Sequence, residues 1–327
     1  MYHFKYPSII GVEITNKCNL RCLHCINSSS YDDKKEMSFE KIKEIIDYMQ
    51  FHGVGCLDIS GGEPLLHPDL EKILDYGVQK GINLSLATNG LLLTQEYVEL
   101  FIKHEVSIRI SYDGYDELSC SKIRGKGVFE HVLTNIKKAI SKGLEPTLVS
   151  VLHSENVCEA EKYVESVSGL GVKKLRLMPF APIGRGERSG MHMVSPTQWK
   201  YILNNFQSWG ARHGVLVVVD SPLMAITHDL VCPCVVGKLY LVIKTNGDAI
   251  PCSLLNYPIG NIYQNTIDEI WNSSVMQEIN DLSKLNEECQ NCVYLKACSG
   301  GCRGMAYLMK GSFLCKDPLC WLQSQNK

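Results

Sequence analysis

Three cysteines lie within eight residues near the N-terminus, at Cys18, Cys22 and Cys25. Thiolates at this spacing on one short loop can bind three irons of a cubane cluster and leave the fourth iron open to a substrate or cofactor. A zinc site with His24 as its fourth ligand is the alternative that the same spacing allows. The three thiols therefore predict a metal centre, and the surrounding residues must decide between iron and zinc.

A second group of nine cysteines follows residue 231. One pair has the Cys-x2-Cys spacing, which by itself would suggest a zinc ribbon. This segment has little continuous apolar pattern, so we expect it to need metal to hold its shape. The nine thiols are Cys232, Cys234, Cys252, Cys289, Cys292, Cys298, Cys302, Cys315 and Cys320.

The 15 cysteines also bear on the compartment. A disulfide framework would imply secretion, yet the N-terminal residues lack the parts of a signal peptide. No apolar run approaches the roughly 20 residues that cross a bilayer. The 33 basic and 35 acidic residues nearly balance, which gives no electrostatic footprint for a nucleic acid or an anionic membrane. We therefore expect a cytoplasmic protein that binds neither.

Short apolar strands and amphipathic helices alternate along residues 8 to 180, and these elements must position the thiols. Six strand–helix units in a row predict an α/β fold with a parallel sheet, open or curled into a partial barrel. The expected strands are Ile9–Ile14, Cys56–Ser60, Asn83–Ala87, Ser107–Ser111, Thr147–Leu152 and Lys174–Met178. The expected helices are Ser38–Phe51, Pro68–Val78, Thr94–Lys103, Phe129–Ser141, Glu155–Val167 and Pro196–Arg212. Farther on, the Asn-Gly pair at 246–247 predicts a hairpin.

Polar and glycine-rich segments follow the first four expected strands, at the carboxyl ends where parallel sheets gather their chemistry. After the second strand, Gly61 and Gly62 would let the backbone approach a ligand, and Glu63 adds an acceptor. Each segment alone is a weak signal, because Gly-Gly-Glu-Pro could be an ordinary turn. The four segments are 16–25, 61–64, 88–90 and 112–114.

Together and in this order, these segments resemble the radical S-adenosylmethionine (SAM) superfamily. The cysteine pattern from 232 to 320, with Gly-Gly-Cys-Arg at 300–303, resembles the SPASM extension of that superfamily. The resemblance implies a partial (β/α)6 barrel of parallel strands plus a small C-terminal iron–sulfur domain. It also implies three [4Fe–4S] clusters and SAM as cofactors.

The resemblance divides the chain into three parts. These are a radical SAM core at 1–190, a connecting helical segment at 191–231 and a SPASM domain at 232–327.

The resemblance also implies roles for single residues. Cys18, Cys22 and Cys25 correspond to the ligands of the catalytic cluster, whose open iron would bind SAM. Arg124 either pairs with the SAM carboxylate or is a capping or surface arginine, and His24 occupies the position beside the adenine. The implied SAM-binding residues are Gly61, Gly62, Glu63, Pro64, Asn89, Ser111, Asp113, Arg124 and His24.

The C-terminal thiols fall into two interleaved sets in the family pattern. Cys234, Cys252 and Cys302 would hold the first auxiliary cluster, and a second set would hold the other. Cys232 is either the fourth ligand of the first cluster or a free thiol that donates a hydrogen atom to the substrate. The second set is Cys289, Cys292, Cys298 and Cys320.

The remaining cysteines have no clear place in the family pattern. Cys120 lies between the fourth expected strand and Arg124, where it is either a catalytic thiol or a packing residue. We expect Cys56 to pack in the core, Cys158 to be structural and Cys315 to be inert.

In this family a 5′-deoxyadenosyl radical abstracts a substrate hydrogen. We expect the substrate to be a ribosomally synthesised peptide that receives a crosslink or is epimerised. The alternative is a small-molecule enzyme, acting on a porphyrin or cofactor precursor or as a dehydrogenase or epimerase of an aminocyclitol. An iron–sulfur electron carrier without radical chemistry needs no SAM site, so the Gly-Gly-Glu-Pro segment argues against it.

Two kinds of partner follow from this expectation. A reductant of the flavodoxin or ferredoxin type would supply the electron that cleaves SAM. The first strand begins near Ser8, which leaves no room for a leader-peptide binder before it, so we expect any such binder to be a separate protein. Arg185, between Gly184 and Gly186, could anchor an anionic substrate group or belong to a charged turn.

Overall fold

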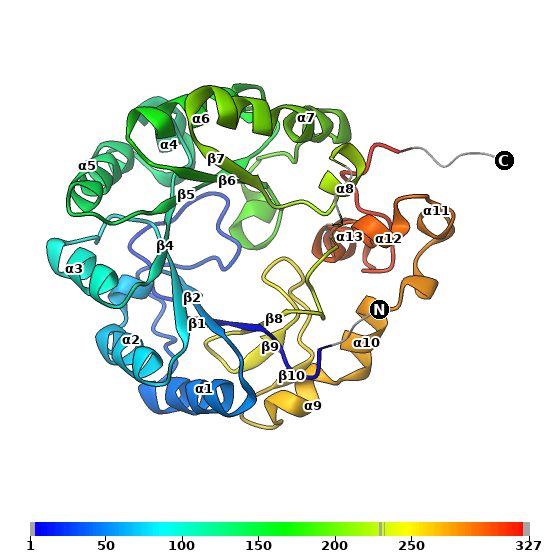
Figure 1. The fold of residues 1–327 in the computed structure, drawn as a ribbon, viewed down its shortest axis with the longest axis horizontal. Helices are drawn as coiled ribbons and strands as arrows, with labels where there is room; N and C mark the ends of the chain where they lie inside the picture. The colour runs from blue at the N-terminus through cyan, green and yellow to red at the C-terminus, as the bar shows by residue number, and fades with distance from the viewer. Residues whose placement is uncertain (1–3, 229–230, 232, 323–327) are drawn as a thin grey trace.

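The computed structural model describes residues 4–228, 231 and 233–322 of the chain. These residues form a ten-stranded sheet in the order β10-β9-β8-β1-β2-β3-β4-β5-β6-β7. The sheet curls into an open barrel with helices on its outer side (Figure 1). The strands are β1 Ile9–Thr15, β2 Cys56–Gly61, β3 Asn83–Thr88, β4 Ser107–Ser111, β5 Thr147–Leu152, β6 Lys174–Pro179, β7 Leu216–Val219, β8 Tyr240–Ile243, β9 Asp248–Ile250 and β10 Gly260–Asn261.

Thirteen α-helices accompany the strands in the described part of the chain. Several begin at a side-chain cap, such as Ser38, whose Oγ accepts a hydrogen bond from the Lys41 backbone. The helices are α1 Phe39–His52, α2 Leu70–Gln79, α3 Gln95–Lys103, α4 Glu117–Arg124, α5 Val128–Ser141, α6 Ala160–Gly169, α7 Pro196–His213, α8 Met224–Thr227, α9 Ile267–Trp271, α10 Ser274–Asn280, α11 Glu287–Gln290, α12 Leu295–Cys298 and α13 Arg303–Lys310. None is long and apolar enough to span a membrane, as far as the described residues go.

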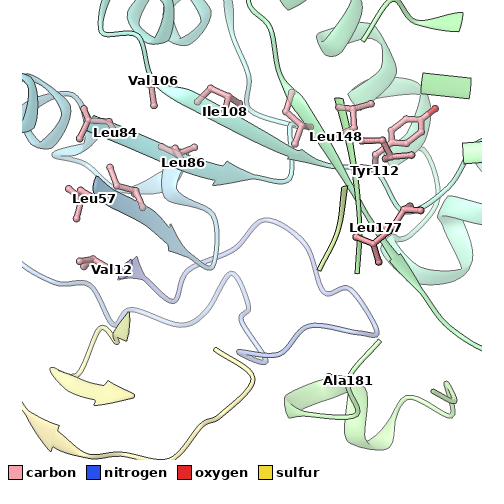
Figure 2. Close-up of a cluster of buried hydrophobic side chains, with 14 of the residues drawn as sticks. Val12, Leu57, Leu84, Leu86, Val106, Ile108, Tyr112, Leu148, Leu177 and Ala181 are labelled. Atoms are coloured by element: carbon pink, nitrogen blue, oxygen red, sulfur yellow. The ribbon is translucent and has the colours of Figure 1, made fainter. Parts of the chain in front are cut away.

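Successive side chains of each strand point alternately to the two sides of the sheet. Apolar residues at every second position, such as Val12, Leu57 and Leu86, are fully buried and belong to one core with helix residues such as Ile42 and Phe101. Figure 2 shows part of this cluster. Side chains at the positions in between must face the barrel interior, since successive residues of a strand point to opposite sides. The interior side of the first strand therefore carries Gly11, Glu13 and Thr15.

The predicted α/β fold with a partial barrel of parallel strands is confirmed. Each of the six expected strands forms within a residue of its expected bounds, and β1 to β7 pair in parallel in chain order. Among the strands and α-helices up to residue 219, two were not expected, the strand β7 and the helix α4. The hairpin expected at Asn246-Gly247 is the turn between the antiparallel strands β8 and β9.

The sheet extends through all three predicted parts of the chain. Strand β7 falls in the segment predicted as a connector, and β8 in the predicted C-terminal domain pairs in parallel with β1. The predicted domain boundaries stay a prediction. What the pairing establishes is that β8 extends the sheet beyond β1, on the edge opposite β2.

The side chain of Tyr240, on β8, lies across the interior side of β1 at Gly11. Its hydroxyl donates to the Asp58 carboxylate on β2 over 3.1 Å, and Asp58 also pairs with Arg109 on β4. A Cβ on Gly11 would lie 2.6 Å from that hydroxyl, closer than side-chain contacts allow. Burial and the neighbouring Asp58 raise the pKa of Tyr240 well above its usual range, so it stays a neutral donor.

We predict that Gly11→Ala lowers the free energy of unfolding by about 1–3 kcal/mol, because the new methyl group overpacks against the Tyr240 hydroxyl. Denaturant unfolding of the variant measures this loss. Tyr240→Phe in the Gly11→Ala background removes the clashing atom and should restore part of the stability relative to the sum of the single changes. Gly55→Ala is the matched control, since a Cβ added there would have no neighbouring atom within 4 Å. If Gly11→Ala lost no more unfolding free energy than the control, the close contact between Gly11 and Tyr240 would be contradicted.

Candidate functional site

The segment between β1 and Ser30 holds the first three cysteines without helix or strand, and we call residues 16–30 the cluster loop. Cys18 and Cys22 are buried, with 9% and 8% of their surface exposed, and Cys25 is half-buried. Burial, together with the nearby charges of Glu63, Cys22 and Cys25, raises the pKa of the Cys18 thiol to about 11. Buried thiols this close together oppose one another's ionisation, and bound metal would relieve that cost.

The end of β2 lies directly against the cluster loop. The Gly62 backbone donates to the Thr15 carbonyl over 2.6 Å, and the Glu63 backbone donates to the Lys17 carbonyl over 2.8 Å. A Cβ on Gly61 or Gly62 would lie 2.2 Å from one of these two carbonyl oxygens. The observed neighbours that require these glycines are the backbone of Thr15, at the end of β1, and the backbone of Lys17 in the cluster loop. The expected close approach of a ligand stays a prediction.

Glu63 is fully buried and accepts three hydrogen bonds. Its Oε1 accepts from the Thr88 hydroxyl over 2.7 Å and from the Leu65 backbone over 3.1 Å, and its Oε2 accepts from the Asn89 backbone over 2.7 Å. Burial raises the pKa of this carboxyl, while the same hydrogen bonds lower it. Asn89 in turn donates to Asn19 on the cluster loop over 2.7 Å. The ends of β2 and β3 are thus tied to each other and to the loop.

Asp113, after β4, joins two residues expected to contact SAM. Its Oδ2 lies 2.7 Å from His24 Nε2 and accepts from Arg124 Nε over 2.8 Å, while Oδ1 accepts from the Val151 backbone over 2.7 Å. Burial would raise the pKa of Asp113, but Arg124 and His24 hold it well below its usual range. Arg124 ends α4, and its Nη1 also donates to Cys22 Sγ over 3.7 Å. Its observed partners are therefore Asp113 and Cys22, and contact with SAM stays a prediction.

Two features beside the cluster loop could receive a ligand. The Nδ1 atom of His24 is buried without a hydrogen-bond partner among the described residues. A pocket of about 280 Å³ borders the loop at Leu23 and reaches His153, which follows β5, and Met191, which follows β6. Ser111, the other residue expected near SAM, ends β4 and is half-buried.

The C-terminal thiols gather into the two expected sets. In the first, Cys302 interacts with Cys234 and Cys252; burial, followed by the charges of Cys234 and Asp317, raises the pKa of Cys302 well above its usual range. Burial also raises the pKa of Cys252 to about 12. Cys232 lies outside the described residues.

In the second set, Cys289 interacts with Cys298, Cys320 and Cys292. Burial raises the pKa of Cys289 to about 11, and the positive charge of Arg303 lowers it. Arg303 is 2% exposed and donates to the Phe313 carbonyl over 2.7 Å, which holds the segment between the last two thiols of this set. Nowhere in the described chain do three His, Cys, Asp or Glu side chains lie close enough to bind one single metal ion. The thiols of a cubane bind different irons.

The other cysteines differ in exposure. Cys120 is 3% exposed and packs against Gly114, where a Cβ would lie 2.4 Å from the Cys120 backbone nitrogen. Burial raises its pKa to about 12, and a role in catalysis stays a prediction. Cys56, expected in the core, is half-buried, and Cys158, expected to be structural, is exposed.

Comparison with known proteins decides the family. A sequence model of the radical SAM superfamily matches residues 12–167, and a model of an iron–sulfur cluster-binding domain, SPASM, matches residues 232–293. The AdoMet-dependent heme synthase of Methanosarcina barkeri is 30% identical over 96% of both chains. The chain belongs to the radical SAM superfamily.

Two further proteins are similar to this chain over most of its length. The PqqA peptide cyclase of Streptomyces rochei is 26% identical over 97% of this chain and 90% of its own. The crystal structure of Streptococcus suis SuiB bound to the precursor peptide SuiA has the same fold, with a TM-score of 0.82 at 16% identity over 98% of this chain and 77% of that one.

The chain is therefore a radical SAM enzyme, and the predicted cofactors, [4Fe–4S] clusters and SAM, are confirmed. The residues fit them. Three thiols, two of them buried, lie on one loop that also carries His24, whose Nδ1 has no hydrogen-bond partner among the described residues. Two further thiol sets lie in the C-terminal segment. The zinc and electron-carrier alternatives lose their support with this assignment.

One residue of the barrel interior, Glu13, could have been identified from the sequence but was not. Glu13 on β1 is 1% exposed, and its Oε2 has no hydrogen-bond partner among the described residues. Burial raises the pKa of this carboxyl, and Lys244 and Asn27 lower it. The available signal was an acidic residue in the middle of the apolar run Ile-Ile-Gly-Val-Glu-Ile.

We predict that Glu13→Gln increases the stability of the apo protein more at pH 8 than at pH 5. A raised folded-state pKa means that the folded chain binds the proton more tightly, so wild-type stability falls as pH rises above the unfolded value near 4.5. Glutamine carries no charge at any of these pH values, so it removes that loss.

Urea unfolding of both proteins across this pH range measures the difference. Glu145→Gln, at an exposed position, is the control and should show no such trend. A Glu13→Gln effect that is constant or falls with pH would disprove the raised pKa.

Proposed function

We propose that this enzyme modifies a ribosomally synthesised peptide at an unactivated carbon, by crosslinking or by epimerisation. When bound, the reduced cluster and SAM supply the 5′-deoxyadenosyl radical that takes a hydrogen atom from the substrate. The observation that carries the radical chemistry is that buried Cys18 and Cys22 and half-buried Cys25 lie together on one loop beside Glu63. The peptide substrate is supported by the relative named PqqA peptide cyclase, which this chain matches over nearly its whole length.

The proposed roles follow the geometry of the cluster loop. Cys18, Cys22 and Cys25 would each bind one iron of the catalytic cluster. The glycines 61–62 hold the end of β2 against that loop, and Glu63 fixes the backbone of Leu65 and Asn89 through its hydrogen bonds. Pro64 begins the 3₁₀ turn 64–66 that follows.

The SAM site would extend from the cluster toward Asp113. The Asp113 carboxylate orients the His24 ring through Nε2 and leaves Nδ1 free for a ligand donor or acceptor. The same carboxylate holds Arg124 near Cys22, where a positive charge favours bound anionic groups. Asn89 and Ser111 complete the set of proposed contacts, and the pocket beside Leu23 is the proposed place for the adenosyl end.

The C-terminal thiols would hold two auxiliary clusters. The set of Cys234, Cys252 and Cys302 would take Cys232 as its fourth ligand, and the second set has four thiols of its own. A separate reductant of the flavodoxin or ferredoxin type would deliver electrons, and a separate leader-binding protein would present the peptide.

Chemistry on a tetrapyrrole is a second candidate. It is favoured by the heme synthase relative, whose identity of 30% exceeds the 26% of the peptide cyclase. Two measurements separate the candidates. Coexpression with each short peptide encoded beside the gene, followed by mass spectrometry, should reveal a mass change that depends on Cys18. The Soret absorbance of heme should not change when heme is mixed with the protein. An unmodified peptide together with a stoichiometric Soret shift would favour the tetrapyrrole.

We predict that anaerobically reconstituted protein binds about twelve irons, from three cubanes of four irons each. The triple variant Cys18→Ala, Cys22→Ala and Cys25→Ala should lose about a third of them, because only one cluster loses its ligands. Iron analysis measures both values. Cys158→Ala, which removes an exposed thiol, should keep all twelve. Bound zinc, or an iron content near two per chain, would refute the cluster assignment.

We also predict that Cys232→Ala lowers the iron content or shifts the EPR signal of the auxiliary clusters, because one iron loses its proposed ligand. A hydrogen-donating thiol would behave differently. The variant would then keep its iron and consume SAM but yield diverted products, and that result would point to epimerisation. Iron analysis and EPR on the variant distinguish these outcomes.

A further inference from the structure

The loop that follows β6 lies against the cluster loop at one residue. Arg185 donates three hydrogen bonds to carbonyl oxygens of the cluster loop. Its backbone donates to Cys25 over 2.9 Å, its Nη1 donates to Cys22 over 2.8 Å, and its Nη2 donates to Ser29. A Cβ on the preceding Gly184 would lie 2.2 Å from the Ile26 carbonyl oxygen. The two loops are therefore in backbone contact around Arg185.

These contacts satisfy carbonyl groups that no regular structure satisfies. The cluster loop has neither helix nor strand from Cys18 to Ser29. Within it, the Cys25 backbone donates to the Cys22 carbonyl and the Ser28 backbone donates to the Cys25 carbonyl, each over 3.3 Å, and the shorter contacts from Arg185 add to these turns. One guanidinium serves Cys22 and Ser29 together, which fixes the distance between the two ends of the segment that carries Cys25. We had considered Arg185 as an anchor for an anionic substrate group. Its terminal nitrogens both donate to the cluster loop instead.

The charge of Arg185 has a second consequence. Its guanidinium contacts the backbone of Cys22, one of the proposed iron ligands. Reduction adds an electron to a cluster, so a fixed positive charge nearby favours the reduced state. An uncharged donor at the same place would hold the loop without this effect.

We propose that Arg185 is a positioning residue for the catalytic cluster. It holds the segment from Cys22 to Ser29 in the conformation that brings the thiols together, and its charge makes the cluster easier to reduce. This inference rests on the proposed assignment of Cys18, Cys22 and Cys25 as cluster ligands. The same loop continues to Ser189 and Met191, which line the pocket beside Leu23, so the cluster loop and the pocket share one support.

Two variants separate the hydrogen bonds from the charge. Arg185→Gln keeps side-chain N–H donors and removes the charge, whereas Arg185→Lys keeps the charge with a single donor group. Arg188→Met is the control, because Arg188 lies in the same turn but is exposed. Each protein is reconstituted anaerobically, and its reduction is followed by EPR in a redox titration. The spectrum of the triple Ala variant is subtracted to isolate the catalytic cluster.

We expect the midpoint potential of the catalytic cluster to become more negative in Arg185→Gln and to stay near the wild-type value in Arg185→Lys and Arg188→Met. With dithionite, release of 5′-deoxyadenosine should fall about tenfold in Arg185→Gln. In the apo proteins, hydrogen exchange at residues 22–30 should be faster in Arg185→Lys than in Arg188→Met, because a lysine cannot serve both carbonyl groups.

A wild-type potential in Arg185→Gln, with or without loss of iron, would overturn the proposed effect of the charge. Unchanged hydrogen exchange in Arg185→Lys would overturn the positioning role. Failure of the proposed function is recognised separately, because the wild type and the triple Ala variant would then give the same EPR spectrum.

Discussion

The cluster loop approaches its neighbours more closely than any side chain would permit. At Gly61, Gly62 and Gly184, an added Cβ would lie 2.2 Å from a backbone oxygen of the loop or of the strand end before it. Gly61 ends β2 and Gly62 follows it, whereas Gly184 lies in the turn after β6. The loop has no secondary structure of its own, so its shape depends on the two strand ends that hold it. The position of the three thiols follows from that contact.

Buried charge then connects the loop to the remaining strands. Glu63 and Asp113 are both buried carboxyl groups, but they are held in different ways. Glu63 accepts hydrogen bonds from neutral donors and has a raised pKa, whereas the positive charge of Arg124 and the hydrogen bond with His24 lower the pKa of Asp113. The first ties β2 to β3, and the second ties β4 to the cluster loop and to β5. Five strand ends thus meet around one metal-binding loop.

Much of this arrangement could be predicted from the sequence because the relevant signals are local. Alternating apolar residues located six strands, and the spacing of the cysteines predicted a metal centre on the loop after β1. The partner of Arg124 could not be predicted, since the contact with Asp113 requires α4, a short helix with little apolar periodicity. The addition of β8 to the sheet beside β1 was also not predicted, because it depends on the crossing of Tyr240 over Gly11 between segments more than 200 residues apart. The role of Arg185 depends on contacts across the barrel and has no local signal.

The central claim is that the cluster loop performs radical chemistry on SAM. The most direct measurement is the release of 5′-deoxyadenosine from SAM by reconstituted protein under anaerobic conditions with dithionite, followed by chromatography. The wild type should release 5′-deoxyadenosine slowly without any substrate, and the variant that lacks Cys18, Cys22 and Cys25 but keeps its auxiliary clusters should release none. Equal release by the two proteins would disprove this claim.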